Sequence, residues 1–296
     1  MAAAALAPGL SWGETDRTVL LVAISDETLA GANINDARAA YRIWLQEVAR
    51  QYGTRTTETV PDIFIPSDDM IRDIRKNAID GFGVTALEFA RVADLTDPDS
   101  LVLQDYLADG MEYVLIVHDR SKLRTVGDLR GANLVSHLHR DMVLGLPWLA
   151  TLLAENNLQP LESFFAGRKL SSSLTQVVLP VFFRRADVAC LARKSWETSL
   201  ELNPQLGRDI RILAVSPKVI PIVFGFRRNT NAHLRQALID AIEHISTIAG
   251  GQQIVALYQS SGFVVRPFSV MKSTLEMVRK YDRLMTQQAG LSKGRQ

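Results

Sequence analysis

The sequence lacks most of the features that mark a membrane-spanning, disulfide-bonded or nucleic-acid-binding protein. It contains one cysteine, Cys190, so neither an intramolecular disulfide nor a multi-cysteine metal site can form. No apolar run reaches the roughly 18 residues that a membrane-spanning helix needs. The 33 basic and 32 acidic residues leave a net charge of +1, which argues against nucleic-acid binding through phosphate neutralisation.

Short catalytic signatures are missing as well. The sequence has no phosphate-binding loop, no H-E-x-x-H and no C-x-x-C. Cys190 lies in an apolar segment typical of a strand, which favours a buried and unreactive thiol. His137 and His139 have no evident third ligand nearby, so a hydrogen-bonded loop pair is favoured over a metal site. We therefore expect no cofactor and no metal.

Length and composition are those of an ordinary soluble protein. The 296 residues are enough for two domains, and 47% are apolar and 22% charged. Residues 1–16 are mostly small and contain no lysine or arginine. They resemble the end of a secretory signal peptide whose charged start is missing. The alternative is a disordered, alanine-rich leader.

Strands and helices alternate in the first part of the chain. Strands are predicted at 18–24, within 54–65 (V-P-D-I-F-I-P), at 78–85 and at 101–107, and helices at 35–52, 69–77 and 86–93. Asn35 or Asp36 is expected to cap the first helix, and Ser67 or Asp68 the second. Alternation without hairpin signals favours a parallel, doubly wound α/β sheet. The second part continues with strands at 113–118, 132–136, 186–191, 211–215 and 220–226, and with helices at 148–155, 174–184, 232–249, 252–260 and 274–288.

Hydroxyl side chains gather at the ends of predicted strands and before predicted helices. Ser25, Thr85, Ser136 and Ser216 follow strands, and 171–173 is a run of serines before a helix. In open α/β sheets, ligands bind beyond the carboxyl ends of the strands, and helix N-termini suit anions. Each position alone is more often a helix cap. Their number predicts a cleft for a small anion.

The segment 112–147 carries a family resemblance. A strand, the run S-K-L-R-T-V-G-D-L-R-G at 121–131 and a second strand follow in the order found where type II periplasmic solute-binding proteins cross between lobes. Residues 17–268 resemble the phosphate/phosphonate/phosphite-binding branch of these proteins. Three further runs carry this resemblance: I-R-K-N-A-I-D-G-F-G-V-T-A-L-E-F at 74–89, F-F-R-R-A-D-V-A-C at 182–190 and R-I-L-A-V-S-P-K-V-I-P at 211–221.

The resemblance implies two Rossmann-like lobes that close by hinge motion on a small oxyanion in the periplasm. The expected division is residues 17–114 with 222–270 for lobe 1, 115–221 for lobe 2 and 271–296 for a C-terminal helix and tail, with crossings near 113–118 and 215–224. The implied partner is the permease of an ABC importer, or a membrane sensor kinase as for some relatives. The usual state of the family is a monomer.

The sequence departs from the phosphonate-binding pattern at most ligand positions. The family's Ser-Thr-Ser-Gly falls on residues 140–143, Arg-Asp-Met-Val. Its two aromatic positions fall on Ser67 and near Val84, and its His-Glu pair falls on Leu174 and Thr175. The strand aspartate is retained as Asp187. Arg140 is therefore expected to supply the charged contact to an oxyanion.

Candidate ligand-binding residues follow from the strand ends and from the family positions. They are Ser25, Ser67, Thr85, Ser136, His137, Arg140, Asp141, Ser173, Thr175, Asp187 and Ser216. Three alternatives remain open: an enzyme on the same scaffold that uses His137 with Asp187, a cytoplasmic ligand-sensing regulatory domain, and an arsenite binder that uses Cys190. The fold alone does not separate them.

Overall fold

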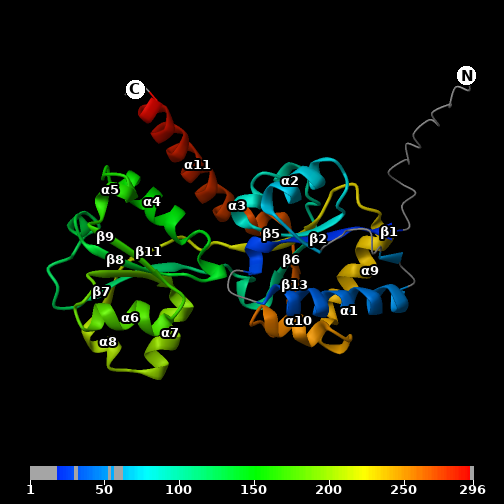
Figure 1. The fold of residues 1–296 in the computed structure, drawn as a ribbon, viewed down its shortest axis with the longest axis horizontal. Helices are drawn as coiled ribbons and strands as arrows, with labels where there is room; N and C mark the ends of the chain where they lie inside the picture. The colour runs from blue at the N-terminus through cyan, green and yellow to red at the C-terminus, as the bar shows by residue number, and fades with distance from the viewer. Residues whose placement is uncertain (1–18, 30–32, 53–54, 57–62, 294–296) are drawn as a thin grey trace, which may run out of the picture.

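The computed structural model describes residues 19–29, 33–52, 55–56 and 63–293. The expected leader at 1–16 and the first part of the strand expected within 54–65 lie outside these residues. The described chain forms two α/β lobes that lie side by side (Figure 1). Each lobe is built on one mixed sheet with helices on both faces.

The first lobe contains a six-stranded sheet in the order β13-β6-β12-β5-β2-β4. Its strands are β2 (Val22–Ser25), β4 (Phe64–Ile65), β5 (Gly81–Thr85), β6 (Leu101–Gln104), β12 (Ile222–Phe226) and β13 (Phe263–Arg266). One face packs on α1 (Ile34–Tyr52), α9 (Ala232–Glu243) and α10 (Gly251–Leu257), and the other on α2 (Ser67–Arg75) and α3 (Ala86–Phe89). A separate pair, β1 (Val19–Leu20) and β3 (Arg55–Thr56), lies beside α1 and α9.

The second lobe contains a five-stranded sheet in the order β11-β7-β10-β8-β9. Its strands are β7 (Tyr113–His118), β8 (Asn133–His137), β9 (Gly167–Ser171), β10 (Val188–Ala192) and β11 (Ile210–Val215). One face packs on α4 (Gly145–Glu155) and α5 (Leu161–Phe164), and the other on α6 (Leu174–Phe182), α7 (Arg193–Leu202) and α8 (Leu206–Asp209). The carboxyl ends of the parallel strands β8 and β10 lie next to each other.

The sheets are mixed, so the expectation of a fully parallel sheet is wrong. β12 runs antiparallel to β5 and β6, and β7 runs antiparallel to β10 and β11. Both strands come directly after the chain has crossed from the other lobe, so they enter their sheets from the opposite direction. β13 is also antiparallel to its neighbour β6.

The two crossing segments pair with each other between the lobes. Met111 and Val219 exchange two backbone hydrogen bonds of 2.8 Å each. The first crossing therefore precedes residues 113–118, which form β7 and lie wholly within the second sheet. Ser216 stabilises the same region, because its hydroxyl accepts from the Tyr113 N–H at 2.8 Å.

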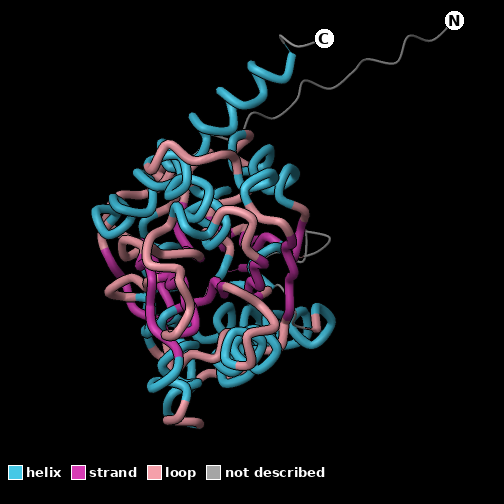
Figure 2. Tube along the Cα trace, turned by 90° about the vertical axis from the view of Figure 1, so that its left-hand side faces the viewer, coloured by secondary structure: helices cyan, strands magenta, loops and turns pink. Residues whose placement is uncertain are grey.

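Helix α11 (Lys272–Lys293) belongs to the cores of both lobes. Leu275 packs in the apolar cluster of the first lobe, whereas Met277 and Val278 pack in that of the second lobe. Thr274 binds the second crossing segment through its hydroxyl, which accepts from the Ile220 N–H at 2.8 Å. The end of α11 projects from the body of the protein (Figures 1 and 2).

The predicted helix caps are wrong in detail. α1 begins at Ile34, and it is the Asn33 side chain that accepts from the Asn35 N–H at 3.0 Å. α2 begins at Ser67 itself, after Pro66, without a side-chain cap. Proline fixes the backbone that enters a helix without donating a hydrogen bond. In the part of the chain that is described, no helix is both long and apolar enough to cross a bilayer.

Candidate functional site

A cleft of about 610 Å³ lies between the lobes. The first lobe contributes Tyr106 and Gln259, the crossing segments contribute 110–112 and Lys218, and the second lobe contributes the ends of β8 and β10. The second-lobe side chains and backbone that line it are His137, His139, Asp141, Ser172, Leu174, Ala192, Arg193, Lys194, Ser195, Glu197 and Thr198. The cleft thus lies at the carboxyl edge of β8 and β10, where α/β sheets bind ligands.

The lobes already touch beside this cleft. The Arg140 Nη1 of the second lobe donates to the backbone oxygen of Leu257 in the first lobe at 2.6 Å. The Tyr106 hydroxyl lies 3.2 Å from both carboxylate oxygens of Asp141, and Lys194 Nζ lies 4.4 Å from the centre of the Tyr106 ring. Burial, and then the charge of Asp141, raise the pKa of Tyr106, so its hydroxyl keeps its proton and donates to Asp141.

Arg140 is a buried cation with free donors. It follows β8 in a short 3₁₀ turn (Arg140–Met142), is 5% exposed and lies over the ring of Tyr258 at 5.6 Å. Its Nε and Nη2 form no hydrogen bond to any described residue, although Nε lies 3.8 Å from an Asp141 oxygen. Nε and Nη2 form one edge of the guanidinium, the geometry that binds an oxyanion through two hydrogen bonds.

His137 and His139 stack at the cleft with ring centres 5.4 Å apart and planes 13° apart. Burial, and then the charge of the other imidazole, lower the pKa of His137; burial also lowers the pKa of His139. Both rings are therefore neutral near pH 7. His139 Nδ1 accepts from the Asp141 N–H at 3.3 Å and so begins the 3₁₀ turn. Among the residues with described positions, no group of three or more potential metal ligands occurs.

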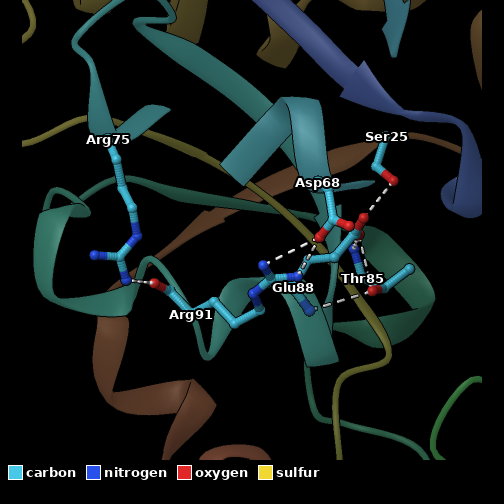
Figure 3. Close-up of polar contacts among 6 residues, drawn as sticks. All are labelled: Ser25, Asp68, Arg75, Thr85, Glu88 and Arg91. Carbon is cyan, nitrogen blue, oxygen red and sulfur yellow. Dashed lines mark hydrogen bonds and ion pairs between the residues drawn. The ribbon is translucent and has the colours of Figure 1, made fainter. Parts of the chain in front are cut away.

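In the first lobe, the Ser25 and Thr85 hydroxyl groups that we predicted to bind an anion donate hydrogen bonds to Glu88 instead. Ser25 Oγ donates to Glu88 Oε1 at 2.5 Å, and the Thr85 N–H and hydroxyl donate to Glu88 Oε2 at 2.7 and 2.9 Å (Figure 3). Glu88 is 4% exposed. Its carboxylate takes the hydrogen bonds that we expected for a ligand. The sequence signal was the Thr85-x-x-Glu88 capping box, which we overlooked.

The remaining predicted hydroxyl groups do not line the cleft. Ser136 is buried within the second sheet beside Cys190, and the Ser216 hydroxyl accepts from the Tyr113 N–H next to the crossing segment. Ser67 opens α2, and Thr175 is exposed on α6. Ser173 precedes α6 without capping it, and its neighbours Ser172 and Leu174 line the cleft instead. Of the predicted residues, only His137 and Asp141 line the cleft, with Arg140 between them in the chain.

Asp187 lies at the opposite edge of the second sheet. It precedes β10 and accepts from the backbone N–H of Asn133 at 2.8 Å and from its side chain at 3.2 Å. Asn133 begins β8, which runs parallel to β10 and ends at His137. The length of the strand therefore separates Asp187 from His137, and the structure does not bring this pair together.

Cys190 also lies away from the cleft. Its side chain is 0% exposed in the core of the second lobe, and burial raises the pKa of the thiol to about 12. At neutral pH almost no thiolate is present, and thiolate is the form that binds arsenite and reacts with alkylating agents.

We expect Cys190 in the folded protein to resist iodoacetamide at pH 7.5. It should be labelled fully in urea, where the thiol is exposed and its pKa returns towards about 8.5. Mass spectrometry of the intact protein before and after unfolding measures both states. Rapid labelling of the folded protein would show that the thiol is accessible and would reopen the arsenite hypothesis.

Sequence reasoning missed Tyr106 and the first turn of α7. The predicted elements included no helix after 186–191, because Ala192 at the helix start has no capping side chain and R-K-S follows it without a clear apolar stripe. Arg193 is held there by two contacts to Glu112: its N–H donates to the backbone oxygen at 2.8 Å and its Nε to the carboxylate at 2.5 Å.

Comparison with known proteins gives the family and the fold. The profile of the periplasmic substrate-binding proteins of phosphonate ABC transporters matches residues 33–266. No curated protein matches the chain. XAC2383 from Xanthomonas citri, solved with a chloride ion, is 17% identical with a TM-score of 0.62, covering 92% of this chain and 100% of that one.

A second solved structure is similar over nearly the same length. PhnD1 from Prochlorococcus marinus, in complex with methylphosphonate, is 16% identical with a TM-score of 0.55, covering 90% of this chain and 98% of that one. These likenesses confirm the type II periplasmic binding fold with two α/β lobes. The family is one of transport substrate-binding proteins and not of enzymes. The chain therefore belongs to the periplasmic substrate-binding proteins of phosphonate ABC transporters.

Proposed function

We propose that the chain captures a small oxyanion of the phosphate, phosphite or phosphonate type in the interlobe cleft and delivers it to an ABC importer. The observation that carries this proposal is the buried edge of Arg140. A guanidinium at 5% exposure whose Nε and Nη2 have no hydrogen-bond partner in the described chain is costly. A bound oxyanion supplies the missing acceptors.

The position of Arg140 supports a role in closure. It lies where the lobes meet, so opening the cleft releases its contact with Leu257 and exposes the free edge. An oxyanion bound at that edge then closes the lobes around itself, and Tyr106 and Asp141 meet across the cleft. Ligand binding and closure are coupled in this way because the ligand supplies acceptors for two buried donors that otherwise form no hydrogen bond.

Several expectations from the sequence become part of the proposal. The chain acts as a monomer, and residues 1–16 include the end of a signal peptide. The first lobe ends before β7 (Tyr113–His118) and not at 114/115, it resumes near 221/222, and the C-terminal helix and tail follow from 271. An alternative partner for the loaded, closed form is a membrane sensor kinase. No described contact favours the kinase over the importer.

A thermal-shift panel tests the ligand class. Phosphate, phosphite, methylphosphonate and sulfate are added separately to the purified protein. A ligand at about 100 times its Kd contributes roughly 2.7 kcal/mol of stability, which raises the Tm by several degrees in a chain of this size. We expect a shift with at least one phosphorus oxyanion and none with sulfate. No shift with any of the phosphorus compounds would overturn the proposal.

A further inference from the structure

The first lobe buries a side-chain amide at the carboxyl end of β6. Gln104 is the last residue of this strand and is 0% exposed. Neither its Oε1 nor its Nε2 forms a hydrogen bond to any residue that the structure describes. Buried amide atoms are normally paired, because leaving them unpaired costs free energy. Gln104 therefore offers one acceptor and two donor hydrogens to a bound molecule.

Strand pairing places the Gln104 side chain on the face of the sheet that α10 covers. Gln104 is the cross-strand partner of Phe263 in β13, and such partners point to the same face. Phe263 packs with the apolar cluster of α1, α9 and α10, and its ring centre lies 5.9 Å from that of Tyr258, which follows α10. Arg140 of the second lobe enters at this point, because it lies over the Tyr258 ring at 5.6 Å and donates to the Leu257 oxygen.

Gln104 and Arg140 thus approach one aromatic cluster from opposite lobes. Both keep unpaired polar atoms there: the two amide atoms of Gln104, and Nε and Nη2 of Arg140. An amide oxygen and a guanidinium in contact would pair with each other, so these two groups do not meet directly. The Ser25 and Thr85 hydroxyl groups of the same sheet edge donate to Glu88 and do not compete with Gln104 for a ligand.

The two amide atoms require different partners on a ligand. Nε2 donates hydrogen bonds, whereas Oε1 only accepts them. A ligand that pairs with both atoms has an unprotonated oxygen and an O–H group. The monoanions of phosphate, phosphite and methylphosphonate have both. Sulfate and methanesulfonate are fully deprotonated at neutral pH, so they offer acceptors alone and leave Oε1 unpaired.

We propose that Gln104 contacts the bound oxyanion opposite Arg140 and selects for an O–H group on that ligand. This inference rests on the proposed function, which places the oxyanion at Arg140. Arg140 donates to the unprotonated oxygens through Nε and Nη2. Gln104 Oε1 accepts from the P–OH group, and Nε2 donates to an unprotonated oxygen. The site then recognises the hydrogen of the ligand in addition to its charge.

Methylphosphonate and methanesulfonate are a matched pair of ligands for the test. Below the second pKa of methylphosphonate, both are monoanions of nearly the same shape, and methylphosphonate alone has an O–H group. Isothermal titration calorimetry at such a pH gives both Kd values. We expect the native protein to bind methylphosphonate about tenfold or more tightly, since an unpaired buried acceptor costs at least this much. Equal or tighter binding of methanesulfonate would overturn this inference and leave the proposed function intact.

Gln104→Leu separates a ligand contact from a structural role. Leucine is of similar size and needs no hydrogen bond, so the ligand-free variant should unfold at the native temperature or above it. Its Kd for the best phosphorus oxyanion of the thermal-shift panel should rise about tenfold or more, and the preference over methanesulfonate should disappear. Gln253→Leu, at an exposed glutamine of α10 outside the cleft lining, is the control.

The outcomes distinguish this inference from the proposed function. A folded Gln104→Leu protein with the native Kd would show that the amide does not contact the ligand, as expected if buried water alone satisfies it. If the variant does not fold, the native comparison of the two monoanions decides. No binding of phosphate, phosphite or methylphosphonate by the native protein would overturn the proposed function itself, and this inference with it.

Discussion

Replacing Arg140 with methionine is expected to weaken the binding of a phosphorus oxyanion by about a hundredfold. Loss of one partner from a buried, hydrogen-bonded charge pair costs roughly 2–5 kcal/mol, and about 2.7 kcal/mol corresponds to a hundredfold change in Kd. Methionine fills a similar volume without the positive charge, which lies over the Tyr258 ring in the native protein. The measurement is the Kd by calorimetry for the best ligand of the thermal-shift panel.

Two further variants separate charge from geometry at this position. Arg140→Lys keeps the positive charge but loses the two-donor edge, so its affinity should fall between those of the native protein and Arg140→Met. Arg185→Met is the control, because this exposed arginine lies over the ring of Phe183, outside the cleft lining. A folded Arg140→Met protein with native affinity would mean that the oxyanion binds elsewhere.

Replacing Arg227 with methionine is expected to lower the free energy of unfolding by about 3–5 kcal/mol. Arg227 and Asp80 form an ion pair at 3.0 Å in the first lobe, and each is 4% exposed. The Asp80 carboxylate also accepts from the Leu21 N–H at 3.1 Å. Removal of the arginine takes a cation away from a buried carboxylate, and removal of one partner of a buried ion pair is strongly destabilising.

Urea unfolding followed by circular dichroism measures this loss. Arg228→Met, at the exposed neighbouring arginine, should shift the midpoint little. The double variant Arg227→Met with Asp80→Asn should recover part of the loss, because it removes the buried charge while keeping an acceptor for Leu21. An unchanged midpoint in Arg227→Met would show that this pair contributes nothing to stability.

The two-lobe α/β architecture was readable from the sequence, whereas strand direction was not. Alternating strands and helices and the run at 121–131 led to the correct fold. The local pattern of β7 and β12 carries no information on orientation, because orientation depends on which lobe the chain has just left. Strand direction in a two-lobe fold is a property of the whole path of the chain.

The candidate site was predicted only in part, for reasons that differ between residues. His137, Arg140 and Asp141 lie at or just after the end of a strand that was predicted at 132–136 and ends one residue later, at His137. Ser25 also follows a strand, but a carboxylate 63 residues further along the chain takes its hydroxyl. Asp187 was assigned through a family position, although it precedes its strand and so lies at the wrong edge.

The start of α7 shows a further limit of pattern reading. A helix without a capping side chain gives no signal at its start, so the sequence predicted no helix after 186–191.

Helix α11 restricts how the cleft can open. The two crossing segments and α11 give the lobes three covalent or packed connections. An opening that pulled α11 from α4 would expose Met277 and Val278, at about 1.5–3 kcal/mol for each side chain. It would also break the ion pair between Lys280 and Glu155, which are 2.6 Å apart. The opening with the lowest free-energy cost therefore rotates the first lobe about the point where α11 leaves it, near Thr274. The rest of α11 then moves together with the second lobe.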